Sequence, residues 1–275
     1  MNHCRSFLLR FTCGVILLNL AGAAWADFDA GAKAYLRNDF ATAIKEFTIE
    51  ARKGNADAQF LLGEMYRKGQ GVSQDYAQAA KWYRQSANQG HATAQNNLGV
   101  MYKTGQGVPQ DFSEAAKWYR RSADQGNANA QLSLGSMYAH GQGVPRDYAE
   151  AAKWYRKSAE QGDIKAQLNL GVLYENGQGL PRDYAEAVKW YRKSADQGHA
   201  SAQQNLGVMY AKGHGVPRDY VRAHMWFSLA SLGMNQKVSA IAVKNRDIVA
   251  SSMTPHQIAE AQRLAREWRP KKSTR

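Results

Sequence analysis

Residues 127–162 read NANAQLSLGSMYAHGQGVPRDYAEAAKWYRKSAEQG, and units of this kind decide the fold. The Ala-Gln pair near the start recurs with a period of 36 residues, and the tryptophan keeps the same period. The glutamines are Gln59, Gln95, Gln131, Gln167 and Gln203, and the tryptophans are Trp82, Trp118, Trp154, Trp190 and Trp226. Because the turns and the bulky side chains repeat together, the period predicts a solenoid of stacked units.

Each unit contains two helices joined by a tight turn. In the quoted unit, Ala130 and Leu134 lie at helical spacing, and Gly141 suits the left-handed position after a helix. A Gly-Gln-Gly-Val-Pro-Arg turn then leads to Asp147, which can cap the second helix, with Glu150 placed to complete a capping box. The second helix is apolar over a wide arc and must be covered on more than one side.

Stacking of consecutive hairpins covers that arc. It removes roughly 200 Å² of the Trp154 ring from water, which contributes up to about 5 kcal/mol. An aromatic binding strip is the alternative, but side chains that stay the same in every copy are explained more simply by packing. We therefore predict that the five tryptophans form the structural core.

The repeated motifs also resemble a known family. Ala-x-Ala-Gln-x-x-Leu-Gly-x-Met-Tyr, Gly-x-Gly-Val-Pro-x-Asp-Tyr and Ala-Ala-Lys-Trp-Tyr-Arg-x-Ser-Ala are similar to the SEL-one-like repeat, a relative of the tetratricopeptide repeat. The resemblance covers residues 55–233 and implies a scaffold that assembles or tethers other proteins, often in the bacterial envelope or secreted. It implies an all-α fold, a right-handed α/α superhelix (solenoid) of stacked helical hairpins with N- and C-terminal capping helices. Some secreted members are rich in cysteine, and this chain departs from them.

The period divides the chain into segments. We expect a signal peptide (1–26), a divergent tetratricopeptide-like capping hairpin (27–54), five repeats (55–90, 91–126, 127–162, 163–198 and 199–234), C-terminal capping helices (235–269) and a frayed basic tail (270–275). In the C-terminal cap, Thr254 and Gln257 predict a capping box, and Ile241 and Ile248 belong to a predicted apolar face.

The first segment has the features of a secretory signal peptide. Two arginines precede the apolar run 11–20, and Ala24-Trp25-Ala26 fits a small-x-small cleavage site. The run is too short for a comfortable membrane span. Both cysteines lie within this segment, so neither disulfides nor a cysteine-ligated metal is expected in the mature chain. We expect a periplasmic or secreted monomer with no membrane span after removal of the signal.

The chain is basic, with a formal charge of +13, or +11 without the two arginines of the signal peptide. Much of the excess recurs on the second helices, at Lys117, Arg120, Arg121, Lys153, Arg156, Lys157, Lys189, Arg192 and Lys193. Cations there complement the helix dipole, which favours a solvated outer face. A ridge that binds an acidic glycan, lipopolysaccharide or anionic lipid is the alternative. Export and the absence of a recognised motif disfavour nucleic acid.

The variable positions of the first helices recur at steps of four, three and four, which places them on one face. They are Asp57, Leu61, Glu64, Lys68, Thr93, Asn97, Val100, Thr104, Asn129, Ser133, Ser136, His140, Lys165, Asn169, Val172, Asn176, Ser201, Asn205, Val208 and Lys212. In solenoids of this type the first helix lines the concave side, so we predict a groove about 40 Å long that binds roughly a dozen residues of a protein or peptide. Asn97, Asn169 and Asn205 occupy the same position of three repeats, which we call a column, and could hydrogen-bond a ligand backbone. The alternative is that these positions are merely exposed and vary in sequence without a functional reason.

The sequence offers little support for a catalytic or metal-binding function. The histidines are scattered, and the two that share a column, His91 and His199, are three units apart and cannot share a metal. The Gly-Gln-Gly turns could mimic a phosphate loop but are explained better as structural turns. We predict no enzyme, no cofactor and no metal. The leading hypothesis is an exported scaffold, adaptor or regulator that binds a protein segment; the alternatives are a polyanion or cell-wall binder and an accessory of an envelope hydrolase.

Overall fold

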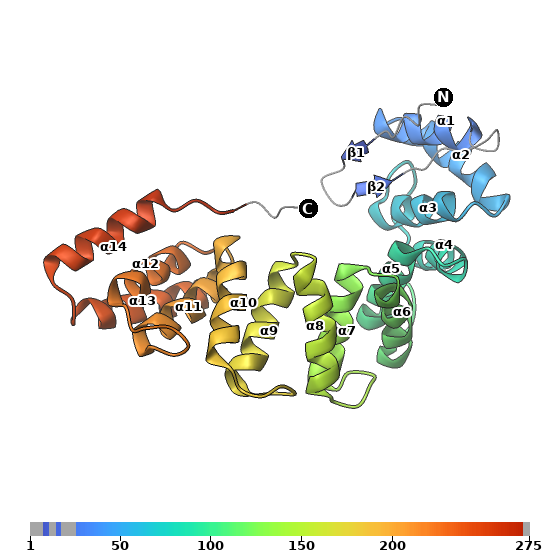
Figure 1. The fold of residues 1–275 in the computed structure, drawn as a ribbon. Coiled ribbons are helices and arrows are strands. Elements are labelled where there is room, and N and C mark those ends of the chain that lie inside the picture. Colours follow the sequence, from blue (N-terminus) through green and yellow to red (C-terminus); the bar gives the residue numbers. More distant parts are fainter. Residues whose placement is uncertain (1–7, 11–14, 18–25, 272–275) are drawn as a thin grey trace, which may run out of the picture. The chain divides into compact units, whose positions relative to one another are not determined.

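The computed structural model describes residues 8–10, 15–17 and 26–271, with side chains from Phe28 onward. The chain divides into two compact units, Met1–Gln110 and Asp111–Arg275, and each is described by itself. Apart from one pair of short strands, all regular structure in the described residues is helical (Figure 1). The prediction of an all-α solenoid of stacked helical hairpins is confirmed.

The first unit contains the strands β1 (Leu8–Arg10) and β2 (Val15–Leu17) and the helices α1 (Ala26–Leu36), α2 (Phe40–Arg52), α3 (Ala56–Lys68), α4 (Tyr76–Asn88) and α5 (Ala92–Thr104). β1 and β2 pair antiparallel, with Leu8 opposite Leu17. Most of the predicted signal peptide, including the first two residues of its cleavage motif, lies outside the described residues, and α1 begins at Ala26.

The second unit contains α6 (Phe112–Asp124), α7 (Ala128–His140), α8 (Tyr148–Glu160), α9 (Ile164–Asn176), α10 (Tyr184–Asp196), α11 (Ala200–Lys212), α12 (Tyr220–Ser231), α13 (Gln236–Ala250) and α14 (Pro255–Glu267). In both units odd-numbered helices from α3 to α11 are the first helices of the repeats, and even-numbered helices from α4 to α12 are the second.

Side-chain caps and glycines set the ends of these helices. Asp147 Oδ1 accepts hydrogen bonds from the amides of Ala149 (2.8 Å) and Glu150 (3.0 Å), which satisfies two donors at the start of α8. α7 ends at Gly141 in the left-handed region. The predicted capping box is wrong. The Glu150 carboxylate does not accept from the backbone N–H of Asp147 but accepts from Lys153 Nζ (3.1 Å) and Trp154 Nε1 (3.2 Å).

The second glycine of each turn seats one hairpin on the hairpin before it. Gly143 has φ +67°, and a Cβ atom there would lie less than 3.0 Å from the carbonyl carbon and oxygen of Phe112, at the start of α6. Gly179 and Gly215 approach Tyr148 and Tyr184 in the same way. These glycines are therefore required by close backbone packing between neighbouring hairpins.

The tryptophans lie where consecutive hairpins meet. Trp118, Trp154, Trp190 and Trp226 are buried, with Trp154 only 1% exposed, whereas Trp82 is half-buried against the apolar cluster of α1, α2 and α3. Trp190, on α10, belongs to the same core cluster as Ala152 and Tyr155 of the preceding hairpin. Each such ring fills a space that a single hairpin could not close.

The C-terminal helices differ from the prediction in two respects. Thr254 and Gln257 form the expected capping box at α14, but Ile241 and Ile248 of α13 are 44% and 57% exposed and do not belong to its buried face. Lys271 belongs to the segment predicted to fray, yet its backbone amide donates to the backbone carbonyl of Asp196 (2.8 Å) and its Nζ pairs with the side-chain carboxylate of Asp196 (2.7 Å). The remainder of that tail, residues 272–275, lies outside the described residues.

Candidate functional site

The predicted binding positions lie on the first helices, and none of the twenty is buried. In the second unit the central positions of the row are half-buried, at Ser133, Ser136, Asn169, Val172, Asn205 and Val208. The flanking positions at the helix ends are exposed at Asn129, His140, Lys165, Asn176 and Lys212, and half-buried at Ser201. We call these twelve residues the first-helix row of the second unit. Small polar side chains in its centre therefore keep partial access to solvent.

Buried tyrosines of the second helices support the centre of this row. Ser136 and Asn169, which lie on two consecutive first helices, adjoin the Tyr155 hydroxyl and favour its ionised form, which partly offsets the effect of burial on its pKa. Ser133 acts on the Tyr119 hydroxyl in the same manner. Burial of the ring raises the pKa of each of these tyrosines to about 12, so both hydroxyls stay neutral.

Tyr191 is the equivalent tyrosine of the next repeat. Its hydroxyl donates to Glu175 Oε2 (2.5 Å) and adjoins Asn205. Burial, followed by the hydrogen bond and charge of Glu175, raises its pKa strongly. An asparagine has one acceptor oxygen and two N–H donors, so Asn169 and Asn205 keep capacity for a ligand beside these hydroxyls. The last repeat has Phe227 at the tyrosine position, and the hydroxyl series ends there.

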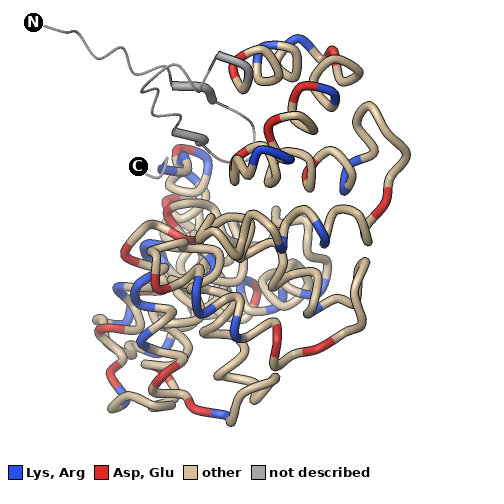
Figure 2. The backbone as a smooth tube through the Cα atoms, turned by 90° about the vertical axis from the view of Figure 1, so that its right-hand side faces the viewer, with Lys and Arg blue, Asp and Glu red and all other residues tan. Residues whose placement is uncertain are grey.

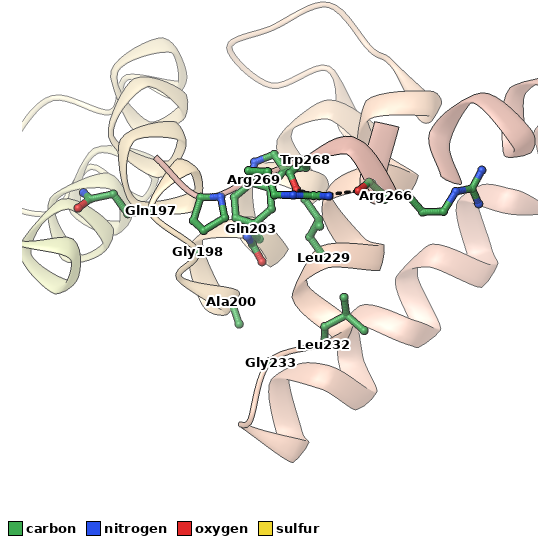
Figure 3. A pocket seen from close by; sticks show the side chains of 12 residues that line it. Gln197, Gly198, Ala200, Gln203, Leu229, Leu232, Gly233, Arg266, Trp268 and Arg269 are labelled. Atoms are coloured by element: carbon green, nitrogen blue, oxygen red, sulfur yellow. Dashed lines mark hydrogen bonds between the residues drawn. The ribbon is translucent and has the colours of Figure 1, made fainter. Parts of the chain in front are cut away.

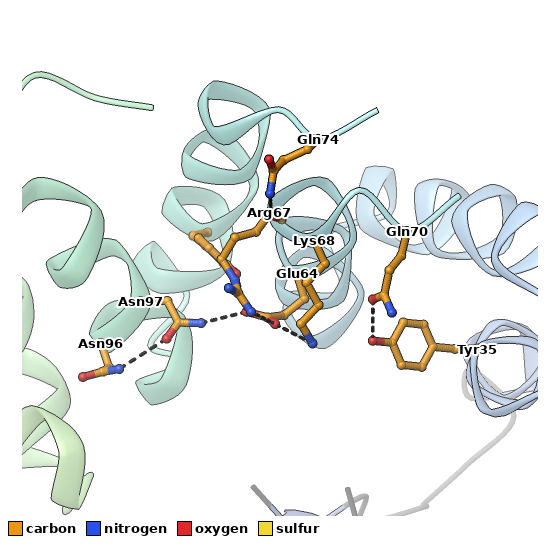
Figure 4. Close-up of polar contacts among 9 residues, drawn as sticks. Tyr35, Glu64, Arg67, Lys68, Gln70, Gln74, Asn96 and Asn97 are labelled. Atoms are coloured by element: carbon orange, nitrogen blue, oxygen red, sulfur yellow. Dashed lines mark hydrogen bonds and ion pairs between the residues drawn. The ribbon is translucent and has the colours of Figure 1, made fainter. Parts of the chain in front are cut away.

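The first unit carries a different arrangement around Glu64, on α3 (Figure 4). Its carboxylate pairs with Arg67 (2.8 Å) and Lys68 (3.0 Å) and accepts from the Tyr83 hydroxyl and from Asn97 Nδ2 (3.1 Å). Burial by itself would raise the pKa of Glu64, but the hydrogen bonds from Arg67, Tyr83 and Lys68 outweigh it and hold the pKa at about 2. Glu64 is therefore a permanent anion at physiological pH.

This network changes the interpretation of the asparagine column. Asn97 uses Nδ2 for Glu64, and its Oδ1 accepts from Asn96 Nδ2 (3.2 Å), so both ends of its amide already have partners. Asn169 and Asn205 have no such acidic neighbour at the equivalent of Glu64, because those positions are Ser136 and Val172. The predicted column thus contains two kinds of asparagine.

The sequence-family model of the Sel1 repeat matches the chain five times, at residues 56–91, 92–127, 128–163, 164–199 and 200–233. The chain belongs to the Sel1 repeat family. A crystal structure of a Sel1 repeat protein from Oxalobacter formigenes is similar over 86% of this chain and 98% of its own, with 32% identity and a TM-score of 0.76.

Two further crystal structures are less similar to this Sel1 repeat protein. A protective antigen of uropathogenic Escherichia coli with an SLR fold is 27% identical over 90% of this chain and 76% of its own, with a TM-score of 0.45. An immunity protein of Pseudomonas aeruginosa is 19% identical over 80% of this chain and 81% of its own, with a TM-score of 0.43. These TM-scores are too low to bear on function. Among curated protein sequences, none matches this chain.

The recurring cations of the Sel1 repeats in the second unit have local partners. One cation in each repeat pairs with the acid three residues before it: Lys117 with Glu114 (2.6 Å), Lys153 with Glu150 (3.1 Å) and Lys189 with Glu186 (2.9 Å). Another donates to a tyrosine of the next first helix: Arg120 to Tyr138, Arg156 to Tyr174 and Arg192 to Tyr210. The third lies over the tryptophan of its own helix: Arg121 over Trp118, Lys157 over Trp154 and Lys193 over Trp190.

These contacts give each recurring cation a partner within the chain, and an acid neutralises one of the three in each repeat. Acidic residues are interspersed with the basic ones along the backbone (Figure 2). Ion pairs on an exposed helix face contribute only about 0.2–1 kcal/mol each, so they neutralise the surface more than they stabilise it.

The described residues were also searched for metal-ligating groups and for membrane-spanning helices. No three His, Cys, Asp or Glu side chains in this part of the chain come together in a group that could hold a metal ion. None of its helices combines the length and the apolar character that crossing a membrane requires.

Proposed function

We propose that this Sel1 repeat protein is an exported, non-catalytic scaffold that binds an extended segment of a protein partner along its first helices. It would act as an adaptor or regulator in the bacterial envelope. The observation that carries the proposal is the position of Asn169 and Asn205. Each adjoins the hydroxyl of a buried tyrosine, is half-buried, and keeps donor and acceptor capacity toward solvent.

An extended peptide suits this arrangement. Its backbone presents alternating N–H and C=O groups at about 3.3 Å per residue, and an asparagine can satisfy one of each. The tyrosine hydroxyls restrict the asparagine side chains before binding, which reduces the entropy lost when a ligand is bound. Val172 and Val208, beside them on the same row, offer apolar contact for alternate side chains.

Site-specific photo-cross-linking in living cells tests the site and the partner together. A photoreactive residue at Asn169 or Asn205 is expected to capture the same protein, whereas one at Lys153, on the second helix α8, is expected to capture none of it. Equal capture from Lys153 would refute the assignment of the binding face, and so would an absence of capture from both asparagine positions.

Affinity measurements with the captured partner then examine the asparagines themselves. Asn169→Ala combined with Asn205→Ala should weaken binding about tenfold, since each lost hydrogen bond costs about 0.5–1.5 kcal/mol. Asn97→Ala is the matched control, because both ends of the Asn97 amide already have internal partners. An equal loss in the control would show that the internal bonds do not distinguish these positions.

The alternative, a polyanion binder acting through the second helices, predicts a different response to salt. Binding of a sulfated polysaccharide such as heparin would weaken steeply with ionic strength and with Lys153→Glu combined with Arg156→Glu. The intramolecular partners of both cations argue against this function. Partner binding along the first helices should change little under either perturbation.

A further inference from the structure

A cavity of about 530 Å³ lies at the end of the repeat stack, between the last Sel1 repeat and the C-terminal segment (Figure 3). Ala200 and Gln203 of α11 and Leu229 of α12 line one side, and Trp268 with Pro270 lines the other. This volume is in the range of pockets that hold small ligands.

The last repeat lacks a glutamine that earlier repeats pair with the glutamine of their first helix. Gln131 Oε1 accepts from Gln161 Nε2 (2.8 Å), and Gln167 Oε1 accepts from Gln197 Nε2 (2.9 Å). One period after Gln197 the chain has Gly233. The same pairing is present in the first unit, where Gln89 Nε2 donates to Gln59 Oε1 (2.7 Å).

Gln203 is consequently left with an unused acceptor. Its Nε2 donates to the carbonyl of Ala195 (3.2 Å), but its Oε1 accepts no hydrogen bond from any described residue. Only 3% of the residue as a whole is exposed, but Oε1 is not among the described acceptors fully removed from solvent, so it can accept from a donor on a molecule in the cavity. Gly233 does not supply the missing group, since even a Cβ atom there would lie 2.6 Å from the Cβ of Ala200.

The wall opposite Gln203 is held in place by the C-terminal segment. The rings of Trp268 and Trp226 meet edge to face with centroids 6.3 Å apart. Lys271 is bonded to Asp196 through both its amide and its Nζ, which holds the chain beyond Pro270 against the end of α10. The cavity is therefore framed by packed side chains on both sides.

The mouth of the cavity is positively charged. Arg269 lines it and donates through Nη1 to the carbonyls of Arg266 (2.6 Å) and Trp268 (2.7 Å), which orients its guanidinium. Neither Arg266 nor Arg269 pairs with a carboxylate among residues 28–271. A guanidinium has five N–H donors, so Arg269 retains several for an anion.

We propose that this cavity binds the carboxyl-terminal end of a peptide whose last residue is apolar. The last backbone N–H donates to Gln203 Oε1, the side chain packs against Leu229 and Trp268, and the carboxylate meets Arg269. This site is separate from the first-helix row and does not rest on the function proposed for it.

Calorimetric titration of the purified protein with acetyl-Gly-Leu tests the chemistry directly. The free carboxylate should bind at least tenfold more tightly than the carboxamide acetyl-Gly-Leu-NH₂. Gln203→Leu should weaken binding about 3- to 10-fold, as expected for one lost hydrogen bond. Arg269→Gln should abolish the preference for the carboxylate, and because Arg269 is exposed the variant should fold normally.

Two matched controls accompany these variants. Gln167→Leu changes the equivalent glutamine of an earlier repeat, which already accepts from Gln197, and Arg182→Gln removes an exposed cation that lies over Tyr184. Both should leave affinity unchanged within twofold. A ten-residue peptide with the same last two residues distinguishes the sources: equal binding assigns the site to protein chain ends, and binding of the short compound alone assigns it to free short peptides.

The proposal is overturned if acetyl-Gly-Leu does not bind at millimolar concentration, or if the carboxamide binds equally well. It is also overturned if Gln203→Leu and Arg269→Gln both bind as tightly as the unaltered protein.

Discussion

Gly141 and Gly143 allow the contact between neighbouring hairpins to be measured separately from backbone strain. Both have φ +67°, so alanine at either position meets the same left-handed backbone penalty of about 1–2 kcal/mol. They differ in surroundings. A Cβ atom at Gly141 would lie 3.3 Å from the Cβ of Arg146, which is tight but close to an ordinary contact. At Gly143 it would overlap the backbone of Phe112, which no change of rotamer can relieve.

Gly143→Ala must therefore separate its loop from the start of α6, and forced overpacking costs about 1–3 kcal/mol more. We expect the free energy of unfolding to fall by about 2–5 kcal/mol for Gly143→Ala and by about 1–2 kcal/mol for Gly141→Ala. Urea denaturation followed by far-ultraviolet circular dichroism measures both losses under the same conditions. Equal losses for the two variants would mean that the turn is not seated on the preceding hairpin, and the packing argument would be wrong.

Three further predictions concern the core and the buried polar groups. Trp154→Ala should lower the free energy of unfolding by about 3–5 kcal/mol; a loss below about 1 kcal/mol in urea denaturation would contradict a ring that is 1% exposed. Because the pKa of Glu64 falls from 4.5 to about 2 on folding, its ionised form stabilises the fold above pH 4.5, and this contribution is lost as the pH falls toward 2. Glu64→Gln should thus be less stable by up to about 3 kcal/mol at neutral pH, with the difference closing in acid; a pH-independent difference in thermal melts would refute the assignment. Gln167→Leu should cost about 1 kcal/mol more than Gln203→Leu in urea titrations, since only Gln167 also accepts from Gln197, and equal costs would argue against the missing pair.

Much of the helical framework was predictable because its determinants are local. Asp147 and Gly141 act within a few residues of the helix ends they define, and the sequence pattern contains all the atoms involved. The capping box of Thr254 and Gln257 is of the same kind. The box expected at Glu150 failed because Lys153 and Trp154, one turn further on, compete for the same carboxylate.

The candidate site was predictable only in outline. The spacing of the variable residues places Asn97, Asn169 and Asn205 in one column, and all three are half-buried. The hydroxyls of Tyr155 and Tyr191, beside Asn169 and Asn205, were not predicted, because side chains that recur in every copy were attributed to packing. A signal was present in the sequence: the position is tyrosine in four repeats and phenylalanine at Phe227, a difference of one hydroxyl at constant ring size.

By itself the sequence determined the period, the two helices of each repeat, their caps and the family, because a repeated short-range pattern specifies each hairpin and the next one. Only the tertiary structure decided which polar groups remain unsatisfied. Asn97 is occupied because Glu64 of another hairpin lies 3.1 Å away, and Gln203 has an unused acceptor because Gly233 stands where a glutamine would donate. Hydrogen bonding depends on distances of about 3 Å between residues far apart in the chain, and such distances exist only after the hairpins have packed.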